Sequence, residues 1–104
     1  MNYVDFVTSK FDEMKELFIK KNEQYSTGDP LANFRTAALM HSGEDSYAAM
    51  YEEAKAFCRK HIAHIENNGI GGAKVAESLG DTAVYSVIMM YMIAAWEKSR
   101  EDKA

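Results

Sequence analysis

Apolar side chains recur every three or four residues along most of this chain, which is the spacing of helices that pack through one face. The clearest run lies between residues 2 and 25 and is interrupted only at Lys21. Its apolar positions are Val4, Val7, Phe11, Met14, Phe18 and Tyr25. The acids that fall on the opposite side of a helical wheel are Asp12, Glu13, Glu16 and Glu23. The pattern predicts a helix over residues 2–25, with Glu13 and Glu16 on a solvated face rather than in a metal site.

Two further helices are predicted over residues 30–41 and 46–66. Asp29 is suited to cap the first of them, and Pro30 suits its first position, where a missing N–H does no harm. Residues 42–46 end this short helix and cap the next one. The apolar face of the short helix consists of Leu31, Phe34, Ala38 and His41. That of the longer helix consists of Tyr47, Met50, Tyr51, Ala54, Phe57, Cys58, Ile62 and Ile65.

Three residues of the third helix have side chains that can also carry chemistry. His61 lies within the apolar face, and His64 lies near its edge. A single histidine on an apolar face is more often a hydrogen-bonded core residue than a ligand. Cys58 is most simply a small core hydrophobe, because no neighbouring base or helix N-terminus would activate its thiol.

The last third of the chain is its most apolar part. From Thr82 to Trp96 the sequence is almost free of polar residues, with Ser86 the exception. A helix of that composition is apolar on every side, so it must be covered by its own chain, by a membrane or by another chain. The run is shorter than the ~20 apolar residues that cross a bilayer. We therefore predict a central helix over residues 73–98, a frayed polar tail after it, and a homo-oligomer.

The predicted fold is all-α and four-helix-bundle-like, with three long helices and one short helix in a single domain over residues 1–104. The chain carries a net charge of −4 and no basic run, which argues against DNA binding. Its single cysteine rules out an internal disulfide. The N-terminus lacks the basic and apolar regions of a signal peptide. We expect a cytoplasmic protein that does not enter a membrane.

Glu77 and Asp81 are the strongest candidates for chemistry. They lie four residues apart, so they share one face of the fourth helix. That face continues with Val84, Tyr85, Ile88 and Met92, so the two acids head an apolar stripe. Two carboxylates in a bundle can bind Mg²⁺, with water and substrate phosphates as its other ligands. An acidic pair near a helix N-terminus is also stabilised by the helix dipole, and composition alone favours that simpler interpretation.

Three segments together carry a resemblance to a known family. Residues 21–25 (KNEQY) and 29–35 (DPLANFR) are similar to a K-N-x-[D/E]-Y and D-P-x-x-N-F pair. Residues 60–65 (KHIAHI) resemble K-H-I-A-R-L, and residues 77–82 (ESLGDT) resemble E-S-L-x-D-T. A second register lays Asp81, Ala83 and Tyr85 on D-x-A-x-Y. In this order the segments resemble small phage and prophage proteins of the MazG-like group.

The resemblance implies an all-α nucleoside triphosphate pyrophosphohydrolase fold that assembles as dimers or tetramers. It implies Mg²⁺ bound by carboxylates and cleavage of a nucleotide between its α- and β-phosphates, in the host cytoplasm if a phage encodes the chain. Under it, Glu77 and Asp81 would be catalytic and metal-binding residues. The nucleotide-binding set would be Lys21, Lys60 and His61 at the phosphates, with Asn33 and Tyr85 elsewhere on the nucleotide.

The sequence also departs from the family pattern. The family pairs an E-E-x-x-E helix with an E-x-x-D helix, whereas Ala56 follows Glu52 and Glu53 at the third acidic position. Gln24 replaces an acid, and His64 replaces an arginine. The sequence therefore leaves open whether the chain is an enzyme. The alternative is a non-catalytic helical oligomeric interaction protein of a phage or prophage that has kept the fold.

Overall fold

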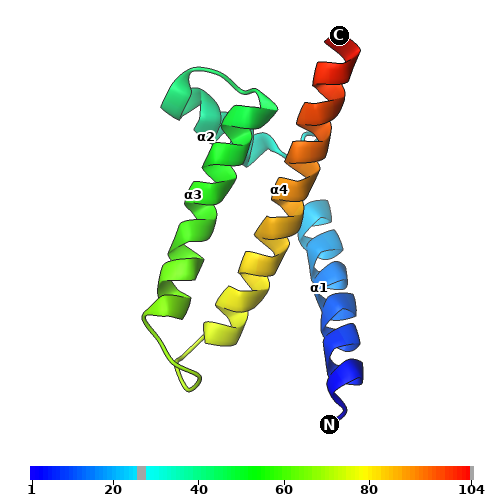
Figure 1. Ribbon diagram of the computed structural model, residues 1–104, viewed down its shortest axis with the longest axis vertical. Coiled ribbons are helices and arrows are strands. Elements are labelled where there is room, and N and C mark those ends of the chain that lie inside the picture. The colour runs from blue at the N-terminus through cyan, green and yellow to red at the C-terminus, as the bar shows by residue number, and fades with distance from the viewer. Residues whose placement is uncertain (26–27, 104) are drawn as a thin grey trace. The chain divides into compact units, whose positions relative to one another are not determined.

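The computed structural model describes residues 1–25 and 28–103 of the chain. These residues form four α-helices and no strand: α1 (Tyr3–Tyr25), α2 (Ala32–Ser42), α3 (Tyr47–Glu66) and α4 (Val75–Lys103) (Figure 1). The predicted all-α class, with three long helices and one short helix, is confirmed. The chain divides into two units, Met1–Pro30 and Leu31–Ala104, and each is described by itself. A single domain over residues 1–104 stays a prediction.

The first unit consists of α1. Its acids are exposed, as the wheel predicts, and the Lys10 ammonium lies 3.2 Å from the Glu13 carboxylate. The predicted apolar seam is exposed at Val4, Phe11 and Phe18 and half-buried at Val7 and Met14. The side chains of Gln24 and Tyr25 and the residues Ser26 and Thr27 lie outside the described part of the chain, and so does what the sequence predicts for them.

The core of the second unit lies where α2, α3 and α4 meet. α3 packs along α4, and α2 packs on α3 (Figure 1). The core consists of Ala38 from α2, Met50 and Ala54 from α3 and Met92 from α4, each at most 1% exposed. The small side chains at 38 and 54 let the helix backbones approach closely, and the two methionines fill the remaining space. The predicted inward faces of these helices are therefore correct at their centres.

Both faces are wrong at their edges. Ile62 on α3 is 45% exposed, because a row at four-residue spacing drifts around a helix of 3.6 residues per turn, and Ile62 is the fourth member of the row that begins at Met50. The His41 side chain is 79% exposed, and its Nδ1 lies 2.7 Å from the Glu53 carboxylate of α3. Glu53 is the more buried partner, with its side chain only 12% exposed. His41 therefore belongs to a polar link between α2 and α3 rather than to the apolar face.

The connection between α2 and α3 follows its prediction closely. Gly43 ends α2 in a left-handed conformation (φ 78°), and its N–H donates to the Leu39 carbonyl at 3.0 Å. A residue with a Cβ is strained in that conformation, which is why glycine suits this position. Ser46 then caps α3, because its Oγ accepts a hydrogen bond from the Ala49 N–H at 3.2 Å.

The starts of α2 and α4 differ from the prediction. α2 begins at Ala32 with Leu31 as its N-cap, so the expected roles of Asp29 as the cap and Pro30 as the first helical residue are wrong. The Leu31 backbone (φ −102°, ψ 13°) lies outside the helical region and delays the start. Lys74 has a positive φ of 61°, so α4 starts at Val75 instead of residue 73.

The predicted fraying after residue 98 is also wrong, since α4 continues to Lys103. The tail contains strong helix formers and neither glycine nor proline. The Arg100 guanidinium stacks on the Trp96 ring at 4.6 Å, one turn away, and holds the first residues of the tail in helical geometry.

Among the described residues, Val75–Asp102 forms one helix long and apolar enough to cross a membrane, judged by length and composition. Only 11% of its apolar window is buried. The stretch without charged residues, from 82 to 96, spans about 22 Å as a helix, less than the ~30 Å of a bilayer core. That α4 is covered by protein stays a prediction.

Replacing Ser46 with alanine will lower the free energy of unfolding by about 1 kcal/mol, because the first turn of α3 loses the acceptor for the Ala49 N–H. Chemical denaturation followed by circular dichroism measures the change. Ser46→Gly is the matched variant, and it should lose only a few tenths of that amount because glycine is itself tolerated at N-caps. Equal losses for the two variants would contradict the capping role.

Candidate functional site

Three of the predicted site residues meet where α3 faces α4. His61 extends from α3, and Asp81 and Tyr85 extend from α4 one turn apart. The His61 Nδ1 lies 3.7 Å from Asp81 Oδ2, with the two side chains 19% and 38% exposed. This distance is longer than a hydrogen bond but short enough for an ion pair when the imidazole is protonated. The prediction that His61 is a core residue is therefore incomplete, since it also faces a carboxylate.

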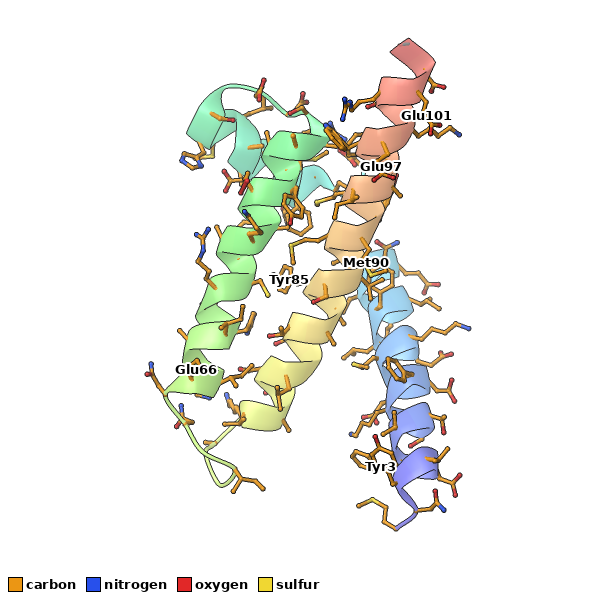
Figure 2. All side chains as sticks on the ribbon, in the orientation of Figure 1. Tyr3, Glu66, Tyr85, Met90, Glu97 and Glu101 are labelled. Atoms are coloured by element: carbon orange, nitrogen blue, oxygen red, sulfur yellow. The ribbon has the colours of Figure 1, made fainter. Side chains whose placement is uncertain are left out.

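A cluster of aromatic rings packs beside these residues. The Tyr85 ring lies 5.8 Å from the His61 ring and 6.4 Å from the Phe34 ring of α2. Phe34 in turn packs at 5.6 Å on Phe57 of α3. Rings at these separations gain from edge and offset packing beyond the area they bury. The cluster ties all three helices of the second unit together beside Asp81, and Figure 2 shows the labelled Tyr85 between α3 and α4.

The pKa of Tyr85 is raised above its ordinary value of 10.0, first by burial, then by the negative charge of Asp81 and then by Cys58. The phenol therefore stays protonated at neutral pH. It can offer a hydroxyl donor at the edge of an otherwise apolar cluster.

Because its folded-state pKa is raised, Tyr85 contributes stability that is present below pH 10 and is lost as pH rises through the raised pKa. Replacing Tyr85 with phenylalanine should therefore flatten the fall in unfolding free energy above pH 10. Urea unfolding at several pH values between neutrality and that range measures the slope. The control is Tyr3→Phe, since Tyr3 is 80% exposed, and its slope should match that of the unmodified protein. An unchanged slope for the Tyr85 variant would contradict this assignment.

Glu77 lies in the first turn of α4, one turn before Asp81, and is exposed. The two carboxylates share a face, as predicted. Within residues 1–25 and 28–103, no three His, Cys, Asp or Glu side chains are grouped so that they could hold a metal ion. Two carboxylates nevertheless fit a Mg²⁺ ion that keeps several waters and is shared with substrate phosphates.

The other predicted nucleotide-binding residues are Lys60, Asn33 and Lys21. Lys60 of α3 and Asn33 of α2 are exposed, and each directly precedes a ring of the cluster, His61 and Phe34. Lys21 is exposed on α1, which belongs to the other unit. The structure therefore brings together His61, Asp81 and Tyr85, with Glu77 one turn away. It does not bring Lys60 or Asn33 into contact with them, and Lys21 belongs to the unit that is described by itself.

His64 holds the connection between α3 and α4, a role that was not predicted from its place at an arginine position of the family pattern. Its Nε2 lies 2.8 Å from the Ala73 carbonyl, and the Asn68 side chain donates to the His64 carbonyl at 2.8 Å. These bonds hold the connection between α3 and α4 directly before Glu77. The Asn-Gly-rich loop that follows this histidine is a partial sign of the role, because such a loop offers many local hydrogen-bonding partners.

Comparison of the chain with protein-family models, with curated proteins and with solved structures finds no match. The resemblance to the MazG-like group therefore stays a prediction, and the residues themselves carry the functional argument.

Proposed function

We propose that the chain binds a nucleoside triphosphate with Mg²⁺ on the face formed by α3 and α4, as a pyrophosphohydrolase or as a nucleotide-binding relative of such enzymes. The observation that carries this proposal is the meeting of His61, Asp81 and Tyr85, with 3.7 Å between imidazole and carboxylate and 5.8 Å between the two rings. An acid, a titratable base and an aromatic hydroxyl side by side are the groups that phosphate chemistry uses.

Each residue of the face has a distinct part in this proposal. Glu77 and Asp81 supply the carboxylate oxygens that suit Mg²⁺, which would neutralise the phosphates when bound. His61 faces Asp81 at 3.7 Å, and its imidazole can hydrogen-bond a phosphate oxygen. Tyr85 adds a neutral hydroxyl donor. Lys60, exposed next to His61, supplies further positive charge toward an approaching anion.

The test is a panel of unmodified and modified deoxynucleotides, each with and without Mg²⁺. We expect at least one of them to raise the melting temperature only when Mg²⁺ is present, because ligands that bind the folded state stabilise it. Release of pyrophosphate from the same nucleotide would make the chain an enzyme. If no nucleotide gives either stabilisation or turnover, the proposal fails.

The alternative function is a non-catalytic helical protein that acts through its oligomer and its surface. It is favoured by the exposed large apolar side chains of α4, which include Val87 and Met90 at 64% and 65% exposure. Under this alternative, Glu77→Gln and Asp81→Asn leave assembly and stability unchanged or improved, because carboxylates without a ligand are of no benefit in a packed site. A large loss of stability in metal-free buffer on making these changes would count against it.

A further inference from the structure

The loop that joins α3 to α4 contains Asn68 directly followed by Gly69 (Figure 1). Both residues are exposed, so water reaches the side-chain amide and the backbone beside it. Asparagine is thermolabile, because the backbone nitrogen that follows it can attack its side-chain amide. Glycine hinders this attack least, since it has no Cβ and the freest backbone. Each of the other asparagines precedes a residue with a Cβ; they are Asn2, Asn22, Asn33 and Asn67.

The space around Gly69 is open. A Cβ built on this residue would meet no atom within 4 Å beyond its chain neighbours, and its φ lies outside the left-handed region. No distant side chain therefore covers the position from which the attack begins. An alanine also fits there without a clash or backbone strain, which makes Gly69→Ala a usable control.

His64 holds the amide group that this reaction would remove. Asn68 Nδ2 donates to the His64 carbonyl at 2.8 Å and lies 3.4 Å from His64 Nδ1. His64 Nε2 lies 2.8 Å from the Ala73 carbonyl, which can only accept, so Nε2 carries the proton and Nδ1 of the neutral ring is an acceptor. Both N–H groups of the Asn68 amide therefore have an acceptor on His64.

We propose that Asn68 is a spontaneous modification site, which deamidates to aspartate and isoaspartate at a rate that His64 limits. The Gly69 nitrogen loses its proton to hydroxide and forms a bond to Asn68 Cγ, while the Cγ–Nδ2 bond breaks and Nδ2 takes up a proton and leaves as ammonia. Water then adds to either carbonyl of the succinimide ring and reopens it. The reaction consumes water and releases ammonia, without an oxidant or a reductant. It does not depend on any ligand at Asp81.

His64 slows this reaction because it stabilises the starting amide. Breaking the Cγ–Nδ2 bond removes the donor from both contacts with His64. The oxygen of the product carboxylate cannot donate to the His64 carbonyl, so the product does not recover what was lost. Loss of one ordinary hydrogen bond corresponds to about fivefold in rate.

The modification changes the loop in which it occurs. Asn68 packs closely on Gly72, because a Cβ placed on Gly72 would lie 2.7 Å from the Asn68 Cβ. Isoaspartate adds a methylene group to the main chain at this crowded point, and aspartate places a carboxylate against the His64 carbonyl. Both products therefore hold the loop before α4 less firmly, and we expect the modified protein to melt at a lower temperature.

The first test follows the full chain in mildly alkaline buffer by mass spectrometry of its peptides. We expect conversion of amide to acid at Asn68 to run well ahead of conversion at Asn67, which lies in the same loop but does not precede glycine. Gly69→Ala should bring Asn68 down to the rate of Asn67. Equal rates at the two asparagines of the unmodified chain, or no effect of Gly69→Ala, overturns the modification site.

The second test measures the part played by His64. His64→Ala removes the Nδ1 acceptor and the link to Ala73, and it should raise the rate at Asn68 about fivefold. The matched control is His41→Ala, whose ring contacts Glu53 instead of the loop and whose loss should leave the rate unchanged. Circular dichroism establishes that both variants fold. An unchanged rate in His64→Ala overturns the role of His64, and so does a rate in unfolding urea that is no higher than that of the folded chain.

Discussion

Replacing Met50 with alanine will lower the free energy of unfolding of the Leu31–Ala104 unit by about 2–5 kcal/mol. Met50 is 1% exposed and packs with Ala38, Ala54 and Met92 at the junction of three helices. Truncation removes buried apolar surface. It also leaves a cavity, because the methyl groups of the neighbouring alanines are too short to fill the space. Since a small protein is stable by only about 5–15 kcal/mol, this change alone can consume much of the total.

Urea unfolding monitored by circular dichroism, at one fixed protein concentration, measures this loss. The matched control is Met40→Ala, which deletes the same atoms from a side chain that is 84% exposed. We expect the control to change stability by no more than about 0.5 kcal/mol. A loss below about 1 kcal/mol for Met50→Ala would show that the packing of α2, α3 and α4 does not stabilise the unit as described.

Asp81→Asn will weaken binding of a Mg²⁺–nucleotide complex at least tenfold. The substitution keeps the shape of the side chain but removes the charge that favours the metal and that faces His61 Nδ1 at 3.7 Å. Loss of one interaction with a charged group is worth about 1.5–3 kcal/mol, and 1.4 kcal/mol is tenfold in affinity. Calorimetric titration of the nucleotide that stabilises the protein best measures the change.

The control for this prediction is Asp102→Asn, which removes the same charge from an exposed position at the other end of α4. Its affinity should equal that of the unmodified protein. If both variants weaken binding equally, the effect comes from net charge, and Asp81 has no special role. Circular dichroism of both variants establishes that the helices remain folded.

The sequence was sufficient to predict most of the fold, because local patterns determine most of it. Four helices follow from apolar spacing, and the Gly43 and Ser46 ends follow from residue types with strong backbone and capping preferences. The buried row of Met50, Ala54 and Cys58 was predicted for the same reason. A helix's inward face depends on its own sequence, whichever neighbour covers it.

The features that the sequence did not predict depend on contacts between helices or on backbone conformations that no residue type strongly favours. The delayed starts of α2 and α4 reflect single backbone angles at Leu31 and Lys74 that no residue type imposes. The tail of α4 is polar but made of good helix formers, so polarity was a poor guide to fraying. The link between His41 and Glu53 joins residues twelve positions apart on two helices, and its existence depends on how the helices pack.

The candidate site shows the same division. The shared face of Glu77 and Asp81 follows from their spacing on one helix. Their approach to His61 required the register of α3 against α4, which a single sequence does not contain. The sequence indicated Phe34 and Phe57 only as core-facing positions. The packing of Phe34 on both Phe57 and Tyr85 depends on how the three helices meet.

Amide NMR spectra with and without a Mg²⁺–nucleotide complex test most directly whether the face shared by α3 and α4 is the proposed nucleotide site. We predict that shifts concentrate at Lys60 and His61 on α3 and at Glu77, Asp81 and Tyr85 on α4. Amide signals around the exposed Met90 of α4 should not shift. An unchanged spectrum at saturating nucleotide, or shifts centred on Met90, would contradict a nucleotide site between α3 and α4.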